Sequence, residues 1–423
     1  MLLAISEKNP NGQDPIIEGW LPSADCWATL YCLRNLGVSI GTSGRVYQGT
    51  EETPWVRLRI TGVGLRGLAT PTSPLDCGNS GTTMRLLAGI LAGQGFGTTL
   101  TGDESLSARP MDRIIEPLTS MGARISGREG RFAPLSIQGG SLKAVKYELP
   151  VASAQVKSSI LLAGLYAAGR TTVVEPIPTR DHTERMLGHL GVQVERQGAD
   201  VSVEGGQQPQ ARDIAVPGDL SSAAFPMGAA LLVAGSSIQI EGVSVNPTRS
   251  GILEVLERMG AEVNRSGEAD QSGEPVANLA IESANLVGAG RIDGDIIPRL
   301  IDEIPIIAVL ASQAQGITEI RGAAELRVKE TDRIATLTTE LRKMGADVKA
   351  LEDGMVIAGP TRLRGAEVSS HGDHRIAMAL AVAALTAEGE TLITRAESTY
   401  VSYPWFDRQL TGLGANLKYE EAD

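Results

Sequence analysis

The chain has 423 residues, of which 42% are hydrophobic and 21% charged, so it is long enough for two domains with sizeable cores. Its net charge of −12 and aromatic content of 4% argue against a nucleic-acid-binding surface, which needs clustered cations and stacking rings. The three cysteines have no metal-like spacing and no apolar run reaches the roughly 18 residues that span a bilayer, so we expect a soluble protein of the cytoplasm.

One phrase recurs six times along the chain: a helical run ending in an apolar residue, then glycine, a small or apolar residue, and a strand. Glycine adopts the left-handed conformation of a helix C-cap at little cost, so each copy predicts a helix end. The glycines are Gly37, Gly122, Gly191, Gly260, Gly345 and Gly414. Since 260−37, 345−122 and 414−191 all equal 223, the chain consists of two homologous halves of three units each.

Most units also contain a second helix that is apolar on nearly all sides and must therefore be buried. In chain order these predicted helices lie at 86–93, 158–169, 225–235, 304–313 and 376–387. Alternating or β-branched strands follow, such as TTVVEP, SSIQIEG, ITEIRG and TLITRA. The pattern predicts an α/β fold with two pseudo-symmetric domains, 1–215 and 216–423, joined at the polar segment 205–213.

The stretch VPGDLSSAAFPMGAALL, from Val216 to Leu232, has no counterpart in the first half. Shifting the chain by 223 aligns IEG at 240–242 with IEG at 17–19, but it places Val216 before Met1. The starting residues MLLAI then correspond to the tail of an apolar helix. We therefore expect the first unit to be incomplete.

The stretch DCGNSGTTMRLLAG, at 76–89, is the first candidate for chemistry. Its glycines and short hydroxyl side chains precede an apolar helix, whose free N–H groups and positive end suit a phosphate or carboxylate. The GxxxxGK[ST] pattern of a nucleotide loop is absent, and an ordinary Asn/Ser helix cap explains the same residues equally well.

Pairs of cations occupy related places in the two halves. RPMDRI contains Arg109 and Arg113, and KETDRI contains Lys329 and Arg333. Four-residue spacing predicts that each pair shares one helical face near the helix N-terminus. Cations at that end oppose the helix dipole, so the pairs indicate a bound anion or a salt bridge to a carboxylate.

Other polar residues stand at the starts of buried or amphipathic helices. SAQVKS places Ser153, Gln155 and Lys157 before a buried helix, where polar groups must be paired or bound. TRDHTER offers Arg180 and His182, and we interpret the histidine as a hydrogen bonder at a helix start.

Acidic and basic groups also border apolar helices in the second half. Asp302 and Glu303 precede one such helix, where an ionised carboxylate is either neutralised by a cation or raised in pKa, which would suit proton transfer. Arg375, after Asp373 and His374, cannot lose its proton and needs an anionic partner. With no recognisable nucleophile or metal spacing, these residues favour a small, multiply anionic substrate held by Arg and Lys while protons move.

Taken together, GNSGTTMR, ARPMDR, ASAQVKSSILLAGL, TRDHTERM, IDEIPIIAVLA, RVKETDRI and DHRIAMALAVAAL resemble the 5-enolpyruvylshikimate-3-phosphate (EPSP) synthase family, from about Ile17 to the end of the chain. The resemblance implies the enolpyruvyl transferase fold, an inside-out α/β barrel in which each domain has three βαβαββ units with inward helices. It implies transfer of the enolpyruvyl group of phosphoenolpyruvate to the 5-hydroxyl of shikimate 3-phosphate, on the route to chorismate and aromatic amino acids. It also implies a monomer without cofactor or metal.

The resemblance assigns a set of residues to each substrate. Ser153, Gln155 and Arg180 are expected to hold shikimate 3-phosphate, together with the backbone of Ala154. Lys329 is expected between the two substrates. The phosphoenolpyruvate set is Gly81, Arg109, Arg333 and Arg375.

The resemblance also implies roles in proton transfer, and the chain departs from the family's pattern in one segment. Asp302 is expected to take the proton of the attacking hydroxyl, and Glu330 to protonate the enol carbon. The family's PGDKSxSHR-like segment, whose Lys, Ser and Arg contact both substrates, is absent, and the later PGDLSSAAF lacks the Lys and the Arg. We therefore expect little activity from this chain, and recovery when roughly 20 upstream residues are restored.

Three alternatives differ in chemistry. UDP-N-acetylglucosamine enolpyruvyl transferase shares the fold but requires a reactive Cys in the loop that reads GDESLSARP here. RNA 3′-phosphate cyclase has similar units, but the acidic charge and missing nucleotide loop weigh against it. A non-catalytic relative would bind shikimate 3-phosphate in a calorimeter without turnover. For the enzyme, we expect the two halves to close over the ligands about the 205–213 segment.

Overall fold

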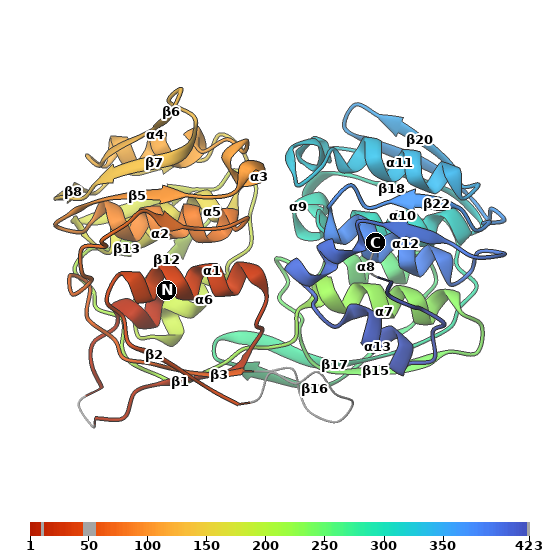
Figure 1. The fold of residues 1–423 in the computed structure, drawn as a ribbon, viewed down its shortest axis with the longest axis horizontal. Helices are drawn as coiled ribbons and strands as arrows, with labels where there is room; N and C mark the ends of the chain where they lie inside the picture. The colour runs from red at the N-terminus through yellow and green to blue at the C-terminus, as the bar shows by residue number, and fades with distance from the viewer. Residues whose placement is uncertain (10–11, 45–55, 421–423) are drawn as a thin grey trace. The chain divides into compact units, whose positions relative to one another are not determined.

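The computed structural model describes residues 1–9, 12–44 and 56–420, and the chain divides into two compact units. The N-terminal unit comprises Met1–Val216 and Gln271–Glu274, and the C-terminal unit comprises Pro217–Asp270 and Pro275–Asp423 (Figure 1). The 205–213 segment is not the junction, because it lies within the N-terminal unit. There the Gln207 side chain donates hydrogen bonds to two backbone carbonyls, so the polar composition reflects a hydrogen-bonded surface segment.

The sheets of the N-terminal unit repeat one order, in which a parallel pair of strands continues into an antiparallel hairpin. In hydrogen-bonding order the four-stranded sheets are β14 (Ile214–Ala215), β1 (Ile16–Trp20), β3 (Val56–Ile60) and β2 (Ile40–Ser43); β4 (Leu75–Asp76), β5 (Gly97–Thr101), β7 (Phe132–Gln138) and β6 (Arg124–Arg128); β9 (Lys146–Glu148), β11 (Arg170–Val174), β13 (Asp200–Glu204) and β12 (Val194–Gln197). The strands β8 (Leu142–Lys143) and β10 (Ala167–Ala168) form a separate, two-stranded parallel sheet.

Helices of the N-terminal unit connect these strands. They are η1 (Leu2–Ile5), α1 (Ala24–Asn35), α2 (Gly81–Ala92), α3 (Glu104–Ser107), α4 (Asp112–Ser120), α5 (Ala154–Gly164) and α6 (His182–His189). The expected apolar helices are confirmed as α2 and α5, which are mostly buried and pack side by side (Figure 1). The MLLAI start, predicted to be a helix tail, forms the buried turn η1 in the same core.

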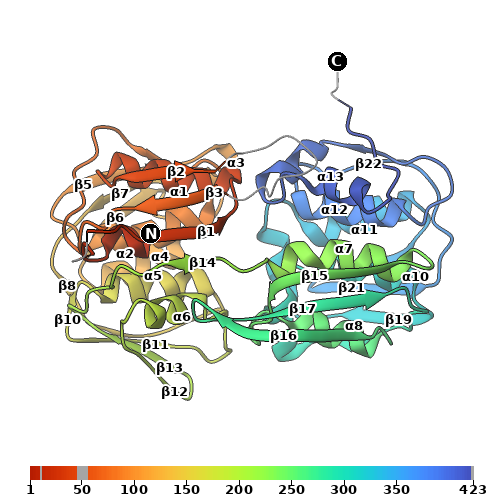
Figure 2. The same cartoon turned by 90° about the horizontal axis from the view of Figure 1, so that it is seen from below.

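The C-terminal unit (Figure 2) repeats the four-stranded order once and contains a three-stranded and a two-stranded sheet besides. Its sheets, in hydrogen-bonding order, are β15 (Ser237–Ser244), β17 (Glu274–Glu282) and β16 (Val263–Gln271); β18 (Gly290–Ile292), β19 (Gly316–Ile320), β21 (Gly354–Gly359) and β20 (Asp347–Leu351); β22 (Glu367–Ser369) and β23 (Leu392–Thr394). Its helices are α7 (Leu220–Leu232), α8 (Gly251–Arg258), η2 (Gly294–Ile296), α9 (Ile297–Leu300), α10 (Ile304–Gln313), η3 (Ala324–Val328), α11 (Arg333–Lys343), α12 (His374–Ala384), η4 (Ala396–Val401) and α13 (Phe406–Gly412). The predicted apolar helices α7, α10 and α12 pack on one another in its core.

The six helix-ending glycines are confirmed as left-handed caps. Their φ angles, in chain order, are +83°, +94°, +81°, +85°, +97° and +101°. After α1, the Gly37 amide donates to the Arg34 carbonyl and the Val38 amide to the Leu33 carbonyl, and the same pair of bonds follows α4, α6, α8, α11 and α13. The 223-residue offset also holds for strands, since 124+223 and 128+223 give 347 and 351, the limits of β20.

Each unit has a hydrophobic core of its own. The buried apolar residues of one core lie between residues 2 and 214, and those of the other lie between residues 220 and 410. Within the described part of the chain, no helix combines the length and apolar character needed to cross a membrane.

Candidate active site

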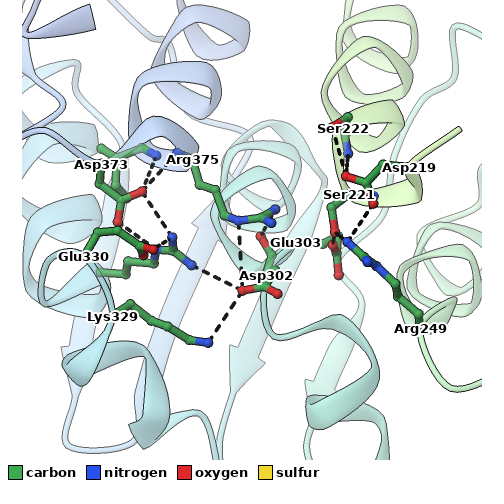
Figure 3. A network of polar contacts seen from close by, with 12 residues as sticks. Asp219, Ser221, Ser222, Arg249, Asp302, Glu303, Lys329, Glu330, Asp373 and Arg375 are labelled. Atoms are coloured by element: carbon green, nitrogen blue, oxygen red, sulfur yellow. Dashed lines mark hydrogen bonds and ion pairs between the residues drawn. The ribbon is translucent and has the colours of Figure 1, made fainter. Parts of the chain in front are cut away.

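A buried ion network in the C-terminal unit is centred on Arg333, the first residue of α11. The side chain is 2% exposed; its Nε donates to Asp373 Oδ2 at 2.7 Å and its Nη2 to Glu330 Oε2 at 2.6 Å. Asp373 and Glu330 are labelled in Figure 3. Its Nη1 lies 3.4 Å from Asp302 Oδ1. Burial opposes the charge of Arg333, but these carboxylates outweigh it and raise the pKa of the guanidinium.

Asp302 lies just before α10 and faces three cations. Its Oδ1 is 3.4 Å from Arg333 Nη1, 3.7 Å from Lys329 Nζ and 3.9 Å from Arg375 Nε, while Arg375 Nη1 donates to the Asp302 carbonyl at 3.2 Å. The side chain is 11% exposed. Of the two alternatives for this carboxylate, the structure therefore supports neutralisation by cations, and Asp302 is also the anionic partner that Arg375 requires.

The start of α12 fixes Arg375 in this network. Asp373 caps the helix, and its carboxylate accepts from the backbone N–H groups of Arg375 and Ile376 at 3.0 and 3.5 Å. Burial, followed by the charges of Arg375 and Arg333, lowers the pKa of His374 to about 4, so this histidine is neutral at pH 7. The positive charge at this helix start therefore comes from Arg375 and not from its neighbour.

The PGDLSS stretch forms a second polar network, beside the first (Figure 3). Asp219 caps α7 and lies 2.7 Å from Arg249 Nη2, which also donates to Ser221 Oγ at 2.6 Å. The Ser221 hydroxyl donates to the carboxylate of Glu303, which is 1% exposed and adjacent to Asp302. This stretch therefore joins the start of α7 to the start of α10, the helix that follows Asp302.

In the N-terminal unit, α2 and α5 begin with hydroxyl caps. Ser80 accepts from the Thr83 amide at 3.2 Å, and Ser153 accepts from the Val156 amide at 3.4 Å. The helix-cap interpretation of the 76–89 stretch is thus confirmed for Ser80.

Basic side chains cluster at these two helix starts. Arg85 Nη1 donates to Gln155 Oε1 at 2.6 Å, and Arg109 Nη2 donates to Asn79 Oδ1 at 2.6 Å. A Cβ atom added at Gly81 would lie 3.0 Å from Arg85 Nη1 and 3.5 Å from Arg109 Nη1. Gly81, Arg109 and Gln155, which were predicted from the sequence to bind substrates, are therefore close neighbours.

Arg180 lies in the loop between β11 and α6, where it is half-buried. His182 begins α6, and its Nδ1 lies 2.7 Å from Glu274 Oε1, as expected for a hydrogen bonder at a helix start. Among the predicted site residues, the N-terminal unit contains Gly81, Arg109, Ser153, Ala154, Gln155 and Arg180, and the C-terminal unit contains Asp302, Lys329, Glu330, Arg333 and Arg375.

The prediction that each cation pair shares a helical face is wrong. Arg109 precedes α4, because the following Pro110 disfavours helical backbone at the residue before it. Lys329 has extended backbone and precedes α11, which is capped by Asp332 through a 3.0 Å bond from the Ala335 amide. Lys329 therefore reaches Asp302 from a loop and not from a helix.

Two site residues have no role in the sequence-based assignment. Arg85 lies four residues after Gly81, and this spacing alone would place both at the same face of α2. Asp373 directly precedes a buried helix, which is the typical position of an N-cap carboxylate. Its pairing with Arg333, 40 residues away in the chain, has no sequence signal.

Comparison with known proteins gives consistent matches over nearly the whole chain. The family model of EPSP synthase (3-phosphoshikimate 1-carboxyvinyltransferase) matches residues 10–410. The 3-phosphoshikimate 1-carboxyvinyltransferase of Brevibacillus brevis is 53% identical over 391 residues, 92% of this chain and 89% of the relative; that of Bacillus thuringiensis strain Al Hakam is 52% identical over 398 residues, 94% and 90%. A solved structure of EPSP synthase from Acinetobacter baumannii is 43% identical and has a TM-score of 0.84, covering 98% of this chain and 92% of that one.

Proposed function

The chain belongs to the EPSP synthase (3-phosphoshikimate 1-carboxyvinyltransferase) family, and from this membership we propose which of its side chains bind the substrates and which move protons. The protein is a carboxyvinyl transferase: it moves the enolpyruvyl group of phosphoenolpyruvate to the 5-hydroxyl of shikimate 3-phosphate and releases phosphate. This reaction belongs to the shikimate pathway. The fold is the two-domain enolpyruvyl transferase fold that the sequence predicts.

Asp302 is our proposed base and Glu330 our proposed acid. The single observation that carries this assignment is the position of Asp302, whose carboxylate faces Lys329, Arg333 and Arg375 within 4 Å. These cations favour the ionised carboxylate, which is the form that can accept a proton, so the base is explained by its ion pairs and not by the raised pKa considered from the sequence. The attacking hydroxyl must lose a proton and the enol carbon must gain one, so the reaction needs one group of each kind. Glu330 is 24% exposed and held by Arg333, so its carboxyl group is both accessible and oriented.

The cations of the C-terminal unit differ in their access to a ligand. Lys329 and Arg375 are 28% and 14% exposed, and we propose that Arg375 binds phosphoenolpyruvate directly while Lys329 lies between the two substrates. Arg333 is 2% exposed, and it acts in the same set while Asp373 and Glu330 hold it in place. Family membership assigns Gly81 and Arg109, of the N-terminal unit, to phosphoenolpyruvate as well.

Shikimate 3-phosphate is assigned to Ser153, Ala154, Gln155 and Arg180. The first three begin α5, where free backbone N–H groups suit a phosphate, and Arg180 supplies the charge. We further propose that the enzyme is a cytoplasmic monomer, since a net charge of −12 opposes self-association and the few cysteines fit a reducing compartment. Light scattering at working concentration checks the monomer.

Phosphate release from phosphoenolpyruvate in the presence of shikimate 3-phosphate tests the assignment. We expect Asp302→Asn and Glu330→Gln each to lower kcat at least about 100-fold, while calorimetry still detects binding of shikimate 3-phosphate. Asp332→Asn is the matched control, because Asp332 caps α11 beside the same network but has no proposed role in proton transfer. Near-normal turnover of either test variant would refute the proposed role.

A further inference from the structure

A buried ion cluster lies in the first turn of α5, among residues that the proposed mechanism does not use. The Lys157 side chain has no exposed surface, and its Nζ lies 3.0 Å from Glu175 Oε1 and 2.6 Å from Glu184 Oε1. Arg196 Nη2 lies 2.8 and 3.5 Å from the same two carboxylates. Two cations thus balance two carboxylates, as burial demands, because an unpaired charge in a protein interior costs several kcal/mol.

Glu175 also closes the loop that carries Arg180. It follows β11, and its Oε1 accepts from the backbone N–H of Thr179 at 3.1 Å and from the Thr179 hydroxyl. Thr179 is 5% exposed and directly precedes Arg180. One carboxylate therefore joins the two ends of this loop and connects them to Lys157.

The cluster thus links Arg180 to the start of α5. Lys157 stands two residues after Gln155 and four after Ser153, within the same helical turn. On its other side, Glu184 lies in the first turn of α6, immediately after the loop. Buried ion pairs therefore hold both elements that flank the loop, so the backbone that carries Arg180 has little freedom to shift.

We propose that Lys157 and Glu175 are positioning residues that hold Arg180 in register with Ser153 and Gln155. This inference rests on the proposed binding of shikimate 3-phosphate by those three residues. Apolar side chains of similar size could fill the same volume with equal or better stability, so a buried ion cluster at this place is better explained by a demand for geometry. Arginine binds a phosphate best when two of its N–H groups are aimed together, and a small displacement weakens both bonds.

Thr179→Val is the decisive variant. It removes the hydroxyl that donates to Glu175 but keeps the side-chain size and the backbone N–H bond, so the fold should persist. We expect the KM for shikimate 3-phosphate to rise roughly ten-fold, with the KM for phosphoenolpyruvate changed less than about two-fold. The matched control is Thr172→Val in β11, which removes a 2.9 Å bond to the Ser202 hydroxyl and should leave both KM values unchanged.

Lys157→Met tests the ion pairs with Glu175 and Glu184. If this variant folds, we expect the KM for shikimate 3-phosphate to rise and the KM for phosphoenolpyruvate to change little, as in Thr179→Val. If it does not fold, Thr179→Val decides the question. Arg180→Gln separates this proposal from the substrate assignment. If Arg180→Gln leaves the KM for shikimate 3-phosphate unchanged, the assignment of Arg180 is wrong. If Arg180→Gln raises that KM and Thr179→Val does not, the substrate assignment stands and the positioning proposal is overturned.

Discussion

At the scale of single residues, the cations of the candidate site are of two kinds. Arg333 is buried and shares its guanidinium among three carboxylates, whereas Lys329 is 28% exposed and lies 3.7 Å from Asp302. A guanidinium presents five N–H donors in a planar fork that reaches carboxylates on several sides, whereas an ammonium has three donors on one nitrogen and spans a smaller space. The two side chains should therefore respond differently to replacement.

Arg333→Met should lower the free energy of unfolding by about 3 to 5 kcal/mol, because it removes the cation that pairs with the fully buried carboxylate of Asp373. Lys329→Met should change it by less than about 1 kcal/mol, since Lys329 is partly exposed and Arg333 and Arg375 still face Asp302, yet lower kcat at least about 100-fold by removing a charge near the reacting groups. Urea denaturation and phosphate release measure the two effects. Equal loss of stability in both variants would contradict this division.

His374 should make the stability of the C-terminal unit depend on pH. Its pKa falls from 6.5 to about 4 on folding, so between these pH values the unfolded chain binds more protons than the folded one. The free energy of unfolding is therefore highest above pH 6.5 and falls toward pH 4, by on the order of 3 kcal/mol from this group alone. The His374→Gln variant should lack this pH-dependent contribution to the free energy of unfolding. Chemical denaturation of both proteins from pH 4 to 7 measures it, and parallel pH profiles would refute it.

At the scale of elements, one helix end recurs six times. Each copy needs a residue with positive φ directly after the helix, and the glycines provide it without steric cost. Of the helices that begin with or directly after site residues, α2, α5, α10 and α12 are mostly buried, whereas α11, which begins with Arg333, is one of the helices that end in a glycine cap.

Two glycines at the end of α6 test the cap. Gly191, at φ +81°, should not tolerate Ala: we expect Gly191→Ala to lower the free energy of unfolding by roughly 1 to 2 kcal/mol, with an added clash because the new Cβ would lie 2.9 Å from Gln210 Cδ. Gly188 lies within the helix with open space around it, so Gly188→Ala should raise stability by about 0.5 to 1 kcal/mol. Thermal or urea denaturation that moves both variants in the same direction would contradict the cap.

At the scale of the whole molecule, the chain folds around two separate hydrophobic cores, one in each unit. We expect Ile307→Ala in α10, a fully buried position, to lower the stability of the C-terminal unit by about 2 to 5 kcal/mol and to leave the other unit unaffected. Leu87→Ala in α2 is the mirror experiment for the N-terminal unit. Hydrogen exchange followed by mass spectrometry reports each unit separately. Uniform acceleration of exchange in both units would mean that the chain unfolds as one cooperative body.

Much of this organisation follows from sequence alone. The glycine spacing predicted two halves of three units, and the apolar runs predicted α2, α5, α7, α10 and α12, because periodicity and backbone conformation are local properties of a chain. The motifs also identified the family and named most of the charged residues of the candidate site. Helix starts were less predictable: Arg109 and Lys329 were placed inside helices that begin after them.

Which acid pairs with which base was decided by the tertiary structure. Asp373 and Arg333 are 40 residues apart, and Thr179, Glu175 and Lys157 meet from a loop, a strand end and a helix. Such pairings depend on removing water and on the directions of side chains from separate elements, neither of which leaves a period or spacing in the sequence. The amino-acid sequence by itself therefore determined the repeated framework and the chemical character of the site. Packing alone decided the partners of its buried charges, because a buried ion is stable only where the fold brings it a counter-charge.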